Sequence, residues 1–194
     1  MLLPNIPADN CDLQCQSSIV TSVSEQFTAL HLYNDPSDEL LEACSVVSSD
    51  TDVVIVERDN NNKWQFKPIS NGHATITITL DPSTSNPLVI APSATTTVYV
   101  TPLTGINITN DFSNVKKGDT VTLNVVDSAE NDITNNCTFT VNSASYVTIE
   151  DGVATMESTV TGSARAIIRA SYTDPNSGYK FTTKVKFTIK SSGS

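Results

Sequence analysis

The sequence predicts an all-β protein in which two β-sandwich domains in tandem follow a short N-terminal arm. Three observations carry this prediction: a composition rich in Thr, Ser and Asn, short runs in which apolar and polar residues alternate, and an internal repeat. β-Branched threonine fits a pleated sheet that faces water on one side. The 194 residues are 38% hydrophobic, which is enough for two thin cores.

Two stretches of the chain recur in the same order. Residues 48–57 (SSDTDVVIVE) resemble residues 142–150 (NSASYVTIE), each a polar turn that leads into a β-branched strand and ends on an acid. Residues 71–78 (NGHATITI) match residues 161–168 (TGSARAII). The offsets are 93 and 90 residues. Because a period of that size suits whole sandwich domains of about 100 residues, the repeat predicts two of them.

Strands can be assigned in both halves from the period of two. Residues 120–125 place Val121, Leu123 and Val125 on one face. Residues 180–189 place Phe181 and every second residue after it inward, with lysines outward. The other strands expected in the second half are 137–141, 146–149 and 164–172, with turns at 151–152 and 174–178. Those expected in the first half are 26–33, 43–47, 53–57, 63–67, 73–80 and 95–101.

Within this scheme, residues 26–33 are ambiguous, because Leu30 and Leu32 lie on the face opposite to Phe27. Either a bulge shifts the register or both faces are buried. Residues 37–43 (SDELLEA) are expected to be helical, and residues 81–93, with three prolines, to form a loop. The expected division is an arm (1–18), a first domain (19–101), a linker (102–104), a second domain (105–190) and a tail (191–194).

In the second half, Gly118-Asp119, Phe139 and Gly162-Ser163-Ala164 carry a resemblance to bacterial Ig-like domains of group 2, with Phe139 at the family's Trp position. In the first half it rests on Val46 at the Trp position, Ser48-Ser49-Asp50 and Gly72-His73-Ala74. The first half departs from the pattern with Ser24-Glu25 in place of Gly-Asp, and it lacks the glycine after strand 53–57.

The resemblance covers residues 19–190 and implies two immunoglobulin-like β-sandwiches. Such domains occur in bacterial adhesins and in phage virion proteins, where they project from a surface and mediate attachment. The fold alone does not settle a function.

The net charge of −10 is concentrated in the first half. Residues 1–101 hold twelve Asp/Glu against three Lys/Arg, giving −9, and residues 102–194 hold nine against eight, giving −1. An acidic half disfavours nucleic acid and anionic membranes and could favour a basic partner surface. The charge could also serve solubility alone.

The four cysteines are expected to be free thiols. Cys44 and Cys137 fall in different halves, and Cys11 and Cys15 precede the first strand, so neither half has the pair that would join two sheets. One close pair is also too few for a four-cysteine zinc site. The N-terminus lacks the features of a signal peptide. These observations favour synthesis in a reducing compartment.

Enzyme activity is not expected, and neither is a cofactor. The two histidines, His31 and His73, share no motif, and no nucleophile or phosphate-binding signature is present. Calcium ligands could converge at Asp127, Glu130 and Asp132, although Asp residues also tighten turns. Trp64 could serve a carbohydrate site, but its alternation with Phe66 favours burial.

The N-terminal arm offers apolar side chains for docking on a neighbouring subunit: Leu2, Leu3, Ile6 and Leu13. A tail without a fixed conformation explains the same composition.

We expect a non-enzymatic bacteriophage virion protein, a capsid auxiliary, decoration or head-fibre subunit made in the host cytoplasm. Its partners would be the major capsid protein or other virion proteins, with host-surface glycans as a further ligand and neither nucleic acid nor membrane. The alternatives are a fragment of a bacterial surface adhesin and a phage tail protein for host attachment.

Overall fold

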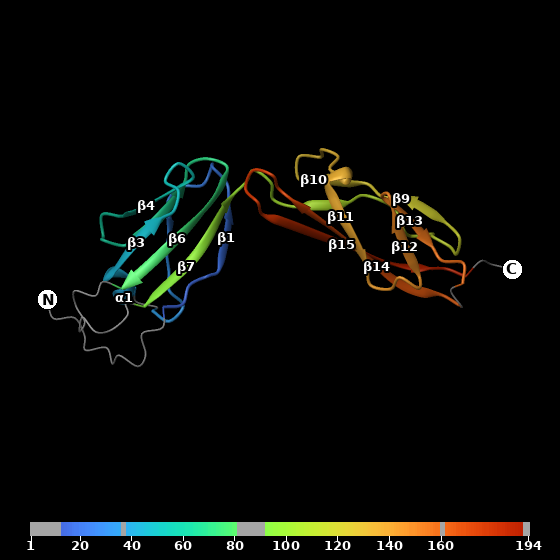
Figure 1. Ribbon diagram of the computed structural model, residues 1–194, viewed down its shortest axis with the longest axis horizontal. Helices are drawn as coiled ribbons and strands as arrows, with labels where there is room; N and C mark the ends of the chain where they lie inside the picture. Colours follow the sequence, from blue (N-terminus) through green and yellow to red (C-terminus); the bar gives the residue numbers. More distant parts are fainter. Residues whose placement is uncertain (1–12, 36–37, 81–91, 160–161, 192–194) are drawn as a thin grey trace. The chain divides into compact units, whose positions relative to one another are not determined.

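The computed structural model describes residues 13–35, 38–80, 92–159 and 162–191, and its regular elements are almost all strands (Figure 1). The chain divides into two compact units between Pro102 and Leu103. In the described residues, no helix is long and apolar enough to cross a membrane. Leu2, Leu3, Ile6 and most of the loop predicted at 81–93 lie outside the described residues.

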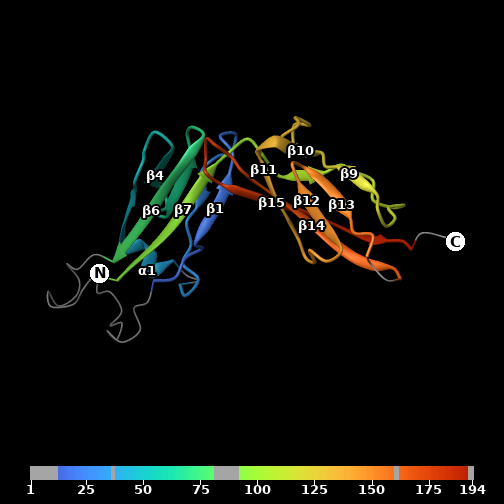
Figure 2. The ribbon, with the colours of Figure 1, turned by 45° about the vertical axis from the view of Figure 1, so that its right-hand side comes forward.

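The first unit is a sandwich of a four-stranded and a three-stranded sheet (Figure 2). The larger sheet has the order β1-β7-β6-β3, with β1 parallel to β7 and the other pairs antiparallel; the smaller has the order β2-β5-β4. Its elements are β1 (Ser18–Thr21), β2 (Thr28–Ala29), α1 (Glu39–Glu42), β3 (Cys44–Ser48), β4 (Val54–Arg58), β5 (Trp64–Pro68), β6 (Gly72–Leu80) and β7 (Ser93–Val100).

The second unit repeats this plan with an extra pair of short strands. Its three sheets have the orders β11-β14-β15, β12-β13-β9 and β10-β8, and all these pairs are antiparallel. Its elements are β8 (Ile106–Ile108), β9 (Thr120–Thr122), β10 (Val125–Asp127), the 3₁₀ helix η3 (Thr134–Asn136), β11 (Cys137–Val141), β12 (Val147–Glu150), β13 (Val153–Met156), β14 (Ala164–Thr173) and β15 (Lys180–Ile189).

The strand order is immunoglobulin-like in both units. Counted from β2, the second, fifth and sixth strands of the first unit form β3-β6-β7, and the first, fourth and third form β2-β5-β4. The second unit has the same two groups, β11-β14-β15 and β9-β13-β12. These correspond to the CFG and BED strands of an immunoglobulin sandwich. The predicted fold class, two tandem immunoglobulin-like β-sandwiches, is therefore confirmed.

Each core is built from the inward residues of the strands that face one another. In the first unit, Ile76, Ile78 and Val98 of the large sheet are fully buried, as is Val54 of the small sheet. In the second unit, Ile168 and Ile189 face Val147 and Met156, and all four are fully buried. The predicted alternation of residues 180–189 is confirmed, because the lysines of β15 are exposed.

The repeat is real, but one of its two offsets is wrong. Ser49 Oγ accepts a hydrogen bond from Thr75 N (2.8 Å), and Asn142 Oδ1 accepts one from Ile167 N (2.6 Å). These matching bonds give offsets of 93 between β3 and β11 and of 92, not 90, between β6 and β14. Gly72 misled the alignment because it begins β6, whereas Gly162 precedes β14. A shift of two residues keeps the same side chains inward, so alternation cannot detect it.

Two predicted strands are shorter than expected. Residues 120–125 divide into β9 and β10, because the chain changes sheets at Leu123, whose N–H donates to Gly152 O (2.8 Å). Residues 26–33 yield only β2: Leu30 N still bonds to Trp64 O (2.9 Å), but Tyr33 N bonds to Gln14 O (2.7 Å). Leu30 and Leu32 are buried while Phe27 and Tyr33 are exposed, so one face alone is buried. The strands β1, β8 and β13 were not predicted.

Candidate functional site

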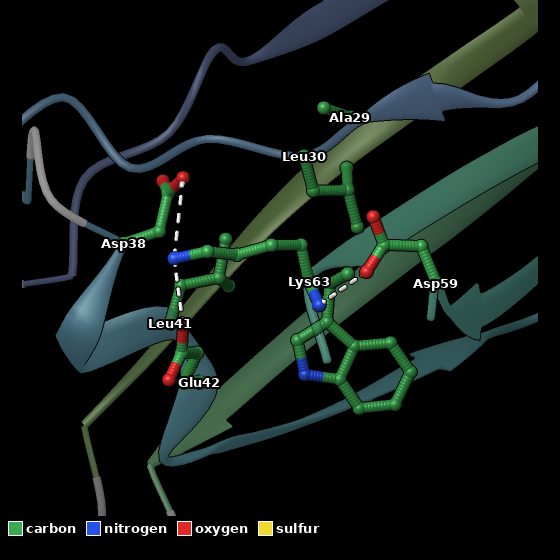
Figure 3. A pocket seen from close by; sticks show the side chains of 8 residues that line it. Ala29, Leu30, Asp38, Leu41, Glu42, Asp59 and Lys63 are labelled. Atoms are coloured by element: carbon green, nitrogen blue, oxygen red, sulfur yellow. Dashed lines mark hydrogen bonds and ion pairs between the residues drawn. The ribbon is translucent and has the colours of Figure 1, made fainter. Parts of the chain in front are cut away.

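A pocket of 160 Å³ lies at the α1 end of the first unit (Figure 3). Lys63 crosses it, with its ammonium 2.6 Å from a Glu42 carboxylate oxygen and 4.0 Å from one of Asp38. The lining residues are Ala29, Leu30, Asp38, Leu41, Glu42, Asp59, Lys63 and Trp64. The pocket thus holds one cation between two acids.

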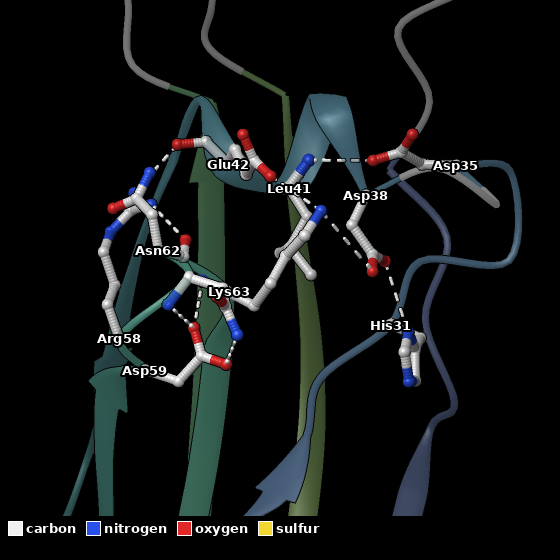
Figure 4. Close-up of polar contacts among 10 residues, drawn as sticks. His31, Asp35, Asp38, Leu41, Glu42, Arg58, Asp59, Asn62 and Lys63 are labelled. Carbon is white, nitrogen blue, oxygen red and sulfur yellow. Dashed lines mark hydrogen bonds and ion pairs between the residues drawn. The ribbon is translucent and has the colours of Figure 1, made fainter.

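Arg58 fastens the same end from the other side (Figure 4). Its guanidinium donates to the carbonyl oxygens of Glu42 (2.8 Å), Cys44 (3.2 Å) and Asn62 (3.0 Å) and lies 4.5 Å from the centre of the Trp64 ring. The last carbonyl of α1 and the first carbonyl of β3 are thereby tied to the β4–β5 turn.

The acids of this end are also used within the fold. Asp35 Oδ2 accepts a hydrogen bond from Leu41 N (2.9 Å), and Asp59 Oδ1 accepts one from Lys63 N (2.8 Å). The Lys63 N–H lowers the pKa of Asp59, and the hydrogen bond to Glu42 raises the pKa of Lys63. Because these partners satisfy one another, the cluster closes the end of the sandwich and leaves little for a ligand.

The two histidines lie apart. His31, predicted inside a strand, lies outside one and places Nδ1 3.2 Å from Asp38 Oδ1. His73 lies on β6 next to Tyr99, with ring centres 6.0 Å apart. Neither histidine is placed beside a nucleophile in the contacts of the described residues.

The calcium candidates of the second unit occupy a turn. Asp127 Oδ1 accepts hydrogen bonds from Ala129 N (2.8 Å) and Asn131 N (3.0 Å), and the Asn131 amide bonds to its other oxygen, which lowers the pKa of Asp127. Asp132 Oδ1 accepts one from Thr134 N (2.9 Å), while Glu130 is exposed with a positive φ. No group of three or more metal-ligating side chains occurs among the residues described.

Of the predicted interface residues, Leu13 alone is described. Its side chain is 7% exposed and belongs to the core of the first unit, so it is covered by its own domain. Phe66 is buried as predicted, and Trp64 is half-buried, with its indole N–H donated to Cys44 O (3.1 Å). The side chain of Tyr33, in the same unit, is 69% exposed.

The outer face of the larger sheet in the first unit is uncharged. Strands β1, β3, β6 and β7 contain no Asp, Glu, Lys or Arg. We call this surface the hydroxyl face; its Ser and Thr residues on β3, β6 and β7 are Ser45, Thr75, Thr77, Thr79, Ser93, Thr95 and Thr97. Val47, 61% exposed, lies among them.

The outer face of the corresponding sheet in the second unit is basic. Strands β11, β14 and β15 contain no acidic residue. Six of the eight Lys and Arg residues of this half project from β14, β15 and the residue after β15, and all six are exposed. We call this the basic face; its cations are Arg165, Arg169, Lys180, Lys184, Lys186 and Lys190.

The cations of the basic face are not neutralised within the fold. Arg169 and Lys184 are directly opposite in the β14–β15 pairing, an arrangement that costs stability. In the described part of the chain, none of the six makes an ion pair within 4.0 Å. Lys190 donates a hydrogen bond to Asn114 Oδ1 (2.8 Å). A hollow of 490 Å³ beside Lys186 and Lys190 has the stacked rings of Phe112 and Phe187 among its lining.

Sequence reasoning found half of this surface. The alternation of residues 180–189 identified the outward lysines, but nothing in that pattern places Arg165 and Arg169 beside them. That step needs the register of β14 against β15, which pairs Arg165 with Thr188 and Arg169 with Lys184.

Three free thiols lie in the described residues: Cys15, Cys44 and Cys137. Cys44 begins β3 and Cys137 begins β11, so the 93-residue offset also relates these two cysteines. Burial raises the pKa of both thiols; that of Cys44 reaches about 11, with the Asp35 charge adding to the rise and Arg58 opposing it. Both thiols therefore stay protonated and weakly reactive at neutral pH.

Comparison with known proteins gives likenesses of structure only. The human desmocollin-1 ectodomain is similar at 7% identity, over 94% of this chain and 40% of that one, with a TM-score of 0.32. The S-layer protein SbsC, domains 4 and 5, is similar at 16% identity over 88% and 84%, with a TM-score of 0.31. Extracellular cadherin domains 1–5 of protocadherin gamma B2 are similar at 10% identity over 94% and 38%, with a TM-score of 0.35.

The chain thus spans less than half the length of the desmocollin and protocadherin structures. No protein-family description matches it, and neither does any curated protein sequence. The immunoglobulin-like assignment rests on the strand order of this chain itself.

Proposed function

We propose that the protein is a non-enzymatic structural subunit of a bacteriophage particle, an auxiliary, decoration or head-fibre protein that displays two Ig-like domains. The observation that carries the proposal is the pair of free thiols at equivalent positions, Cys44 and Cys137, in two tandem sandwiches. A protein that folds with unpaired thiols suits a reducing compartment, and phage particles assemble in the host cytoplasm.

The shapes of the two units also support a binding role. Sandwich domains present broad sheet faces, and here the corresponding faces differ: one is uncharged and the other basic. Different faces on repeated modules suit a subunit that contacts two different surfaces, one on the particle and one outside it. We also propose that both halves are bacterial Ig-like domains of group 2, on the basis of the sequence motifs quoted above.

The test is quantitative mass spectrometry of purified particles and of cell fractions from the source culture. A copy number equal to that of the major shell protein, or a fixed simple fraction of it, supports the capsid role. A handful of copies per particle points to the tail or to sparse fibres. Recovery only in the cell envelope would overturn the proposal in favour of a bacterial surface adhesin.

The arm has a separate test. Removing residues 1–12 keeps Leu13, which is buried in the core of the first unit. If the arm docks on the shell through Leu2, Leu3 and Ile6, occupancy on the particle should fall by at least about tenfold, since several apolar side chains would be lost from the interface. Unchanged occupancy would exclude the arm and leave the sheet faces as the contact.

A further inference from the structure

We propose that the basic face of the second unit binds a linear anionic glycopolymer, a chain that carries a phosphate or a carboxylate at regular intervals. This goes beyond the proposed virion role and does not depend on it. The inference starts from six exposed cations on a two-strand surface that holds no acid, in a protein whose net charge is −10.

The spacing of the cations suits a linear partner. Residues two apart on one face of a strand are about 7 Å apart, so Lys184 and Lys186 are neighbours and the row from Lys180 to Lys190 spans about 34 Å. Arg165 and Arg169 run beside that row on β14, at the interstrand distance of about 4.8 Å. A polymer that lies along β15 and carries one anion about every 7 Å would meet a cation at every anion or every second anion.

Protection against aggregation explains only part of this surface. Lysines on an edge strand prevent pairing with other sheets, and β15 is at the end of its sheet. However, β14 is the central strand, with both of its edges paired, and it carries Arg165 and Arg169. The opposition of Arg169 and Lys184 also costs stability in the free protein, which a bound anion would relieve.

The composition of the face argues against a protein partner. Protein interfaces have an apolar centre with aromatic anchors, and lysine is depleted from them. On the outward side of β11, β14 and β15 the residues between the cations are mostly Thr and Ser, and the half-buried Ile167 is the sole apolar one. Hydroxyl groups beside cations are suited to hydrated sugars and polyols.

Nucleic acid fits less well. Proteins that bind single strands place aromatic side chains on the binding surface, where the bases stack. The outward side of these three strands has no aromatic residue, and the aromatic rings of β15, Phe181 and Phe187, are buried. The face therefore offers charge and hydrogen bonds without a platform for bases.

The experiment measures binding of the full chain to defined polymers at low and at physiological salt. The probes are poly(glycerol phosphate), polygalacturonate, neutral dextran and a single-stranded thymidine oligonucleotide. Arg169→Thr/Lys184→Thr gives these positions the threonines that the first unit has. Lys67→Thr/Lys117→Thr is the matched control, because it removes two positive charges from positions outside the basic face. Circular dichroism verifies that both variants fold.

The expected result is salt-sensitive binding of one or both anionic polymers and none of dextran. Arg169→Thr/Lys184→Thr should weaken binding by about tenfold, because a face with two fewer cations releases fewer counterions from the polymer when it binds. The control should change binding by less than about twofold. Preference for the phosphate polymer or for the carboxylate polymer identifies the source, and either supports the proposal.

Three outcomes would overturn it: no binding of either anionic polymer, equal weakening in both variants, or tighter binding of the oligonucleotide. Equal weakening would mean that net charge, not the face, attracts the polymer. None of these outcomes bears on whether the protein is found in particles, so the proposed function would stand or fall separately.

Discussion

The two units have equivalent cores and different outer faces, one uncharged and one basic. Through the paired registers, Thr77, Thr95 and Thr97 of the first unit correspond to Arg169, Lys184 and Lys186 of the second. One residue earlier on the same strands, β6 and β14, the inward residue stays apolar in both units: Ile76 corresponds to Ile168, and both are fully buried. Burial constrains the inward half of each strand, while the outward half is free to diverge and so carries whatever distinguishes the two domains.

The ends of the units differ as well. The first unit closes one end with α1, Lys63 and Arg58. The second unit instead pairs β8 with β10, and the turn that follows β10 is held by Asp127. The same sandwich thus tolerates a charged cluster or a hydrogen-bonded turn where its sheets end.

The equivalence of the cores predicts the largest effect. Ile76→Ala and Ile168→Ala should each lower the free energy of unfolding by about 3–4 kcal/mol, because each leaves a cavity at a fully buried position. Denaturant unfolding, with hydrogen exchange to assign the loss to β6 or β14, measures it. A cost below about 1 kcal/mol at one site alone would break the equivalence of the two cores.

The α1 end should show a contrast between the units. Arg58→Ala should destabilise the first unit by about 2–3 kcal/mol, because three backbone carbonyls lose a charged donor. Arg165→Ala, at an exposed position of the basic face, should change stability by less than about 0.5 kcal/mol. Thermal melts of the two variants measure the difference, and similar melting points would contradict the role of Arg58.

Cys44 should make stability fall at alkaline pH. The folded thiol keeps its proton up to a pKa of about 11, whereas the unfolded thiol loses it near 9.0. Between these values the unfolded state binds fewer protons, so the free energy of unfolding decreases as the pH rises, by about 1–2 kcal/mol. Below the unfolded pKa this contribution is fully present.

The measurement compares urea unfolding of the native protein and of Cys44→Ala at several pH values from about 8 to about 11, a range that includes the pKa of the unfolded and of the folded thiol. The variant should show a shallower decline, whatever its absolute stability. Cys137→Ala is the control from the equivalent position; its half-buried thiol should change the slope less. Parallel pH curves for native protein and Cys44→Ala would contradict the prediction.

The smallest effects come from the two matching turn bonds. Ser49→Ala and Asn142→Ala each remove the acceptor for a backbone N–H, at Thr75 and Ile167 respectively, and should cost about 0.5–1.5 kcal/mol. Chemical denaturation of each single variant tests whether the bonds are equivalent. A measurable cost at one position and none at the other would show that the repeat is conserved in geometry but not in energy.

The fold was predictable because it depends on alternation. Strands such as 137–141 and 180–189 were placed correctly from the period of two, since each has one buried face. The failures have one cause: pairing partners are not encoded in a strand's own pattern. Residues 120–125 look like one strand yet divide between two sheets, and Gly72 looked equivalent to Gly162 although the hydrogen bonds of Thr75 and Ile167 say otherwise.

The candidate surfaces were harder to predict for the same reason. The outward lysines of β15 could be read from the sequence, but the addition of Arg169 required the β14–β15 register. The cluster around Lys63 unites α1 with the β4–β5 turn, residues that are far enough apart in sequence for no local pattern to connect them.

The parallel pairing of β1 with β7 has a consequence for synthesis on the ribosome. Ser18 pairs with Thr97, so the strand made first completes its sheet only when the last strand of the unit has emerged. The second unit has a related closure, a parallel bridge from Lys116 to Lys190. Contacts so distant in sequence form slowly. Both β1 and the segment at Lys116 therefore wait for their partners until the ribosome has nearly finished each domain.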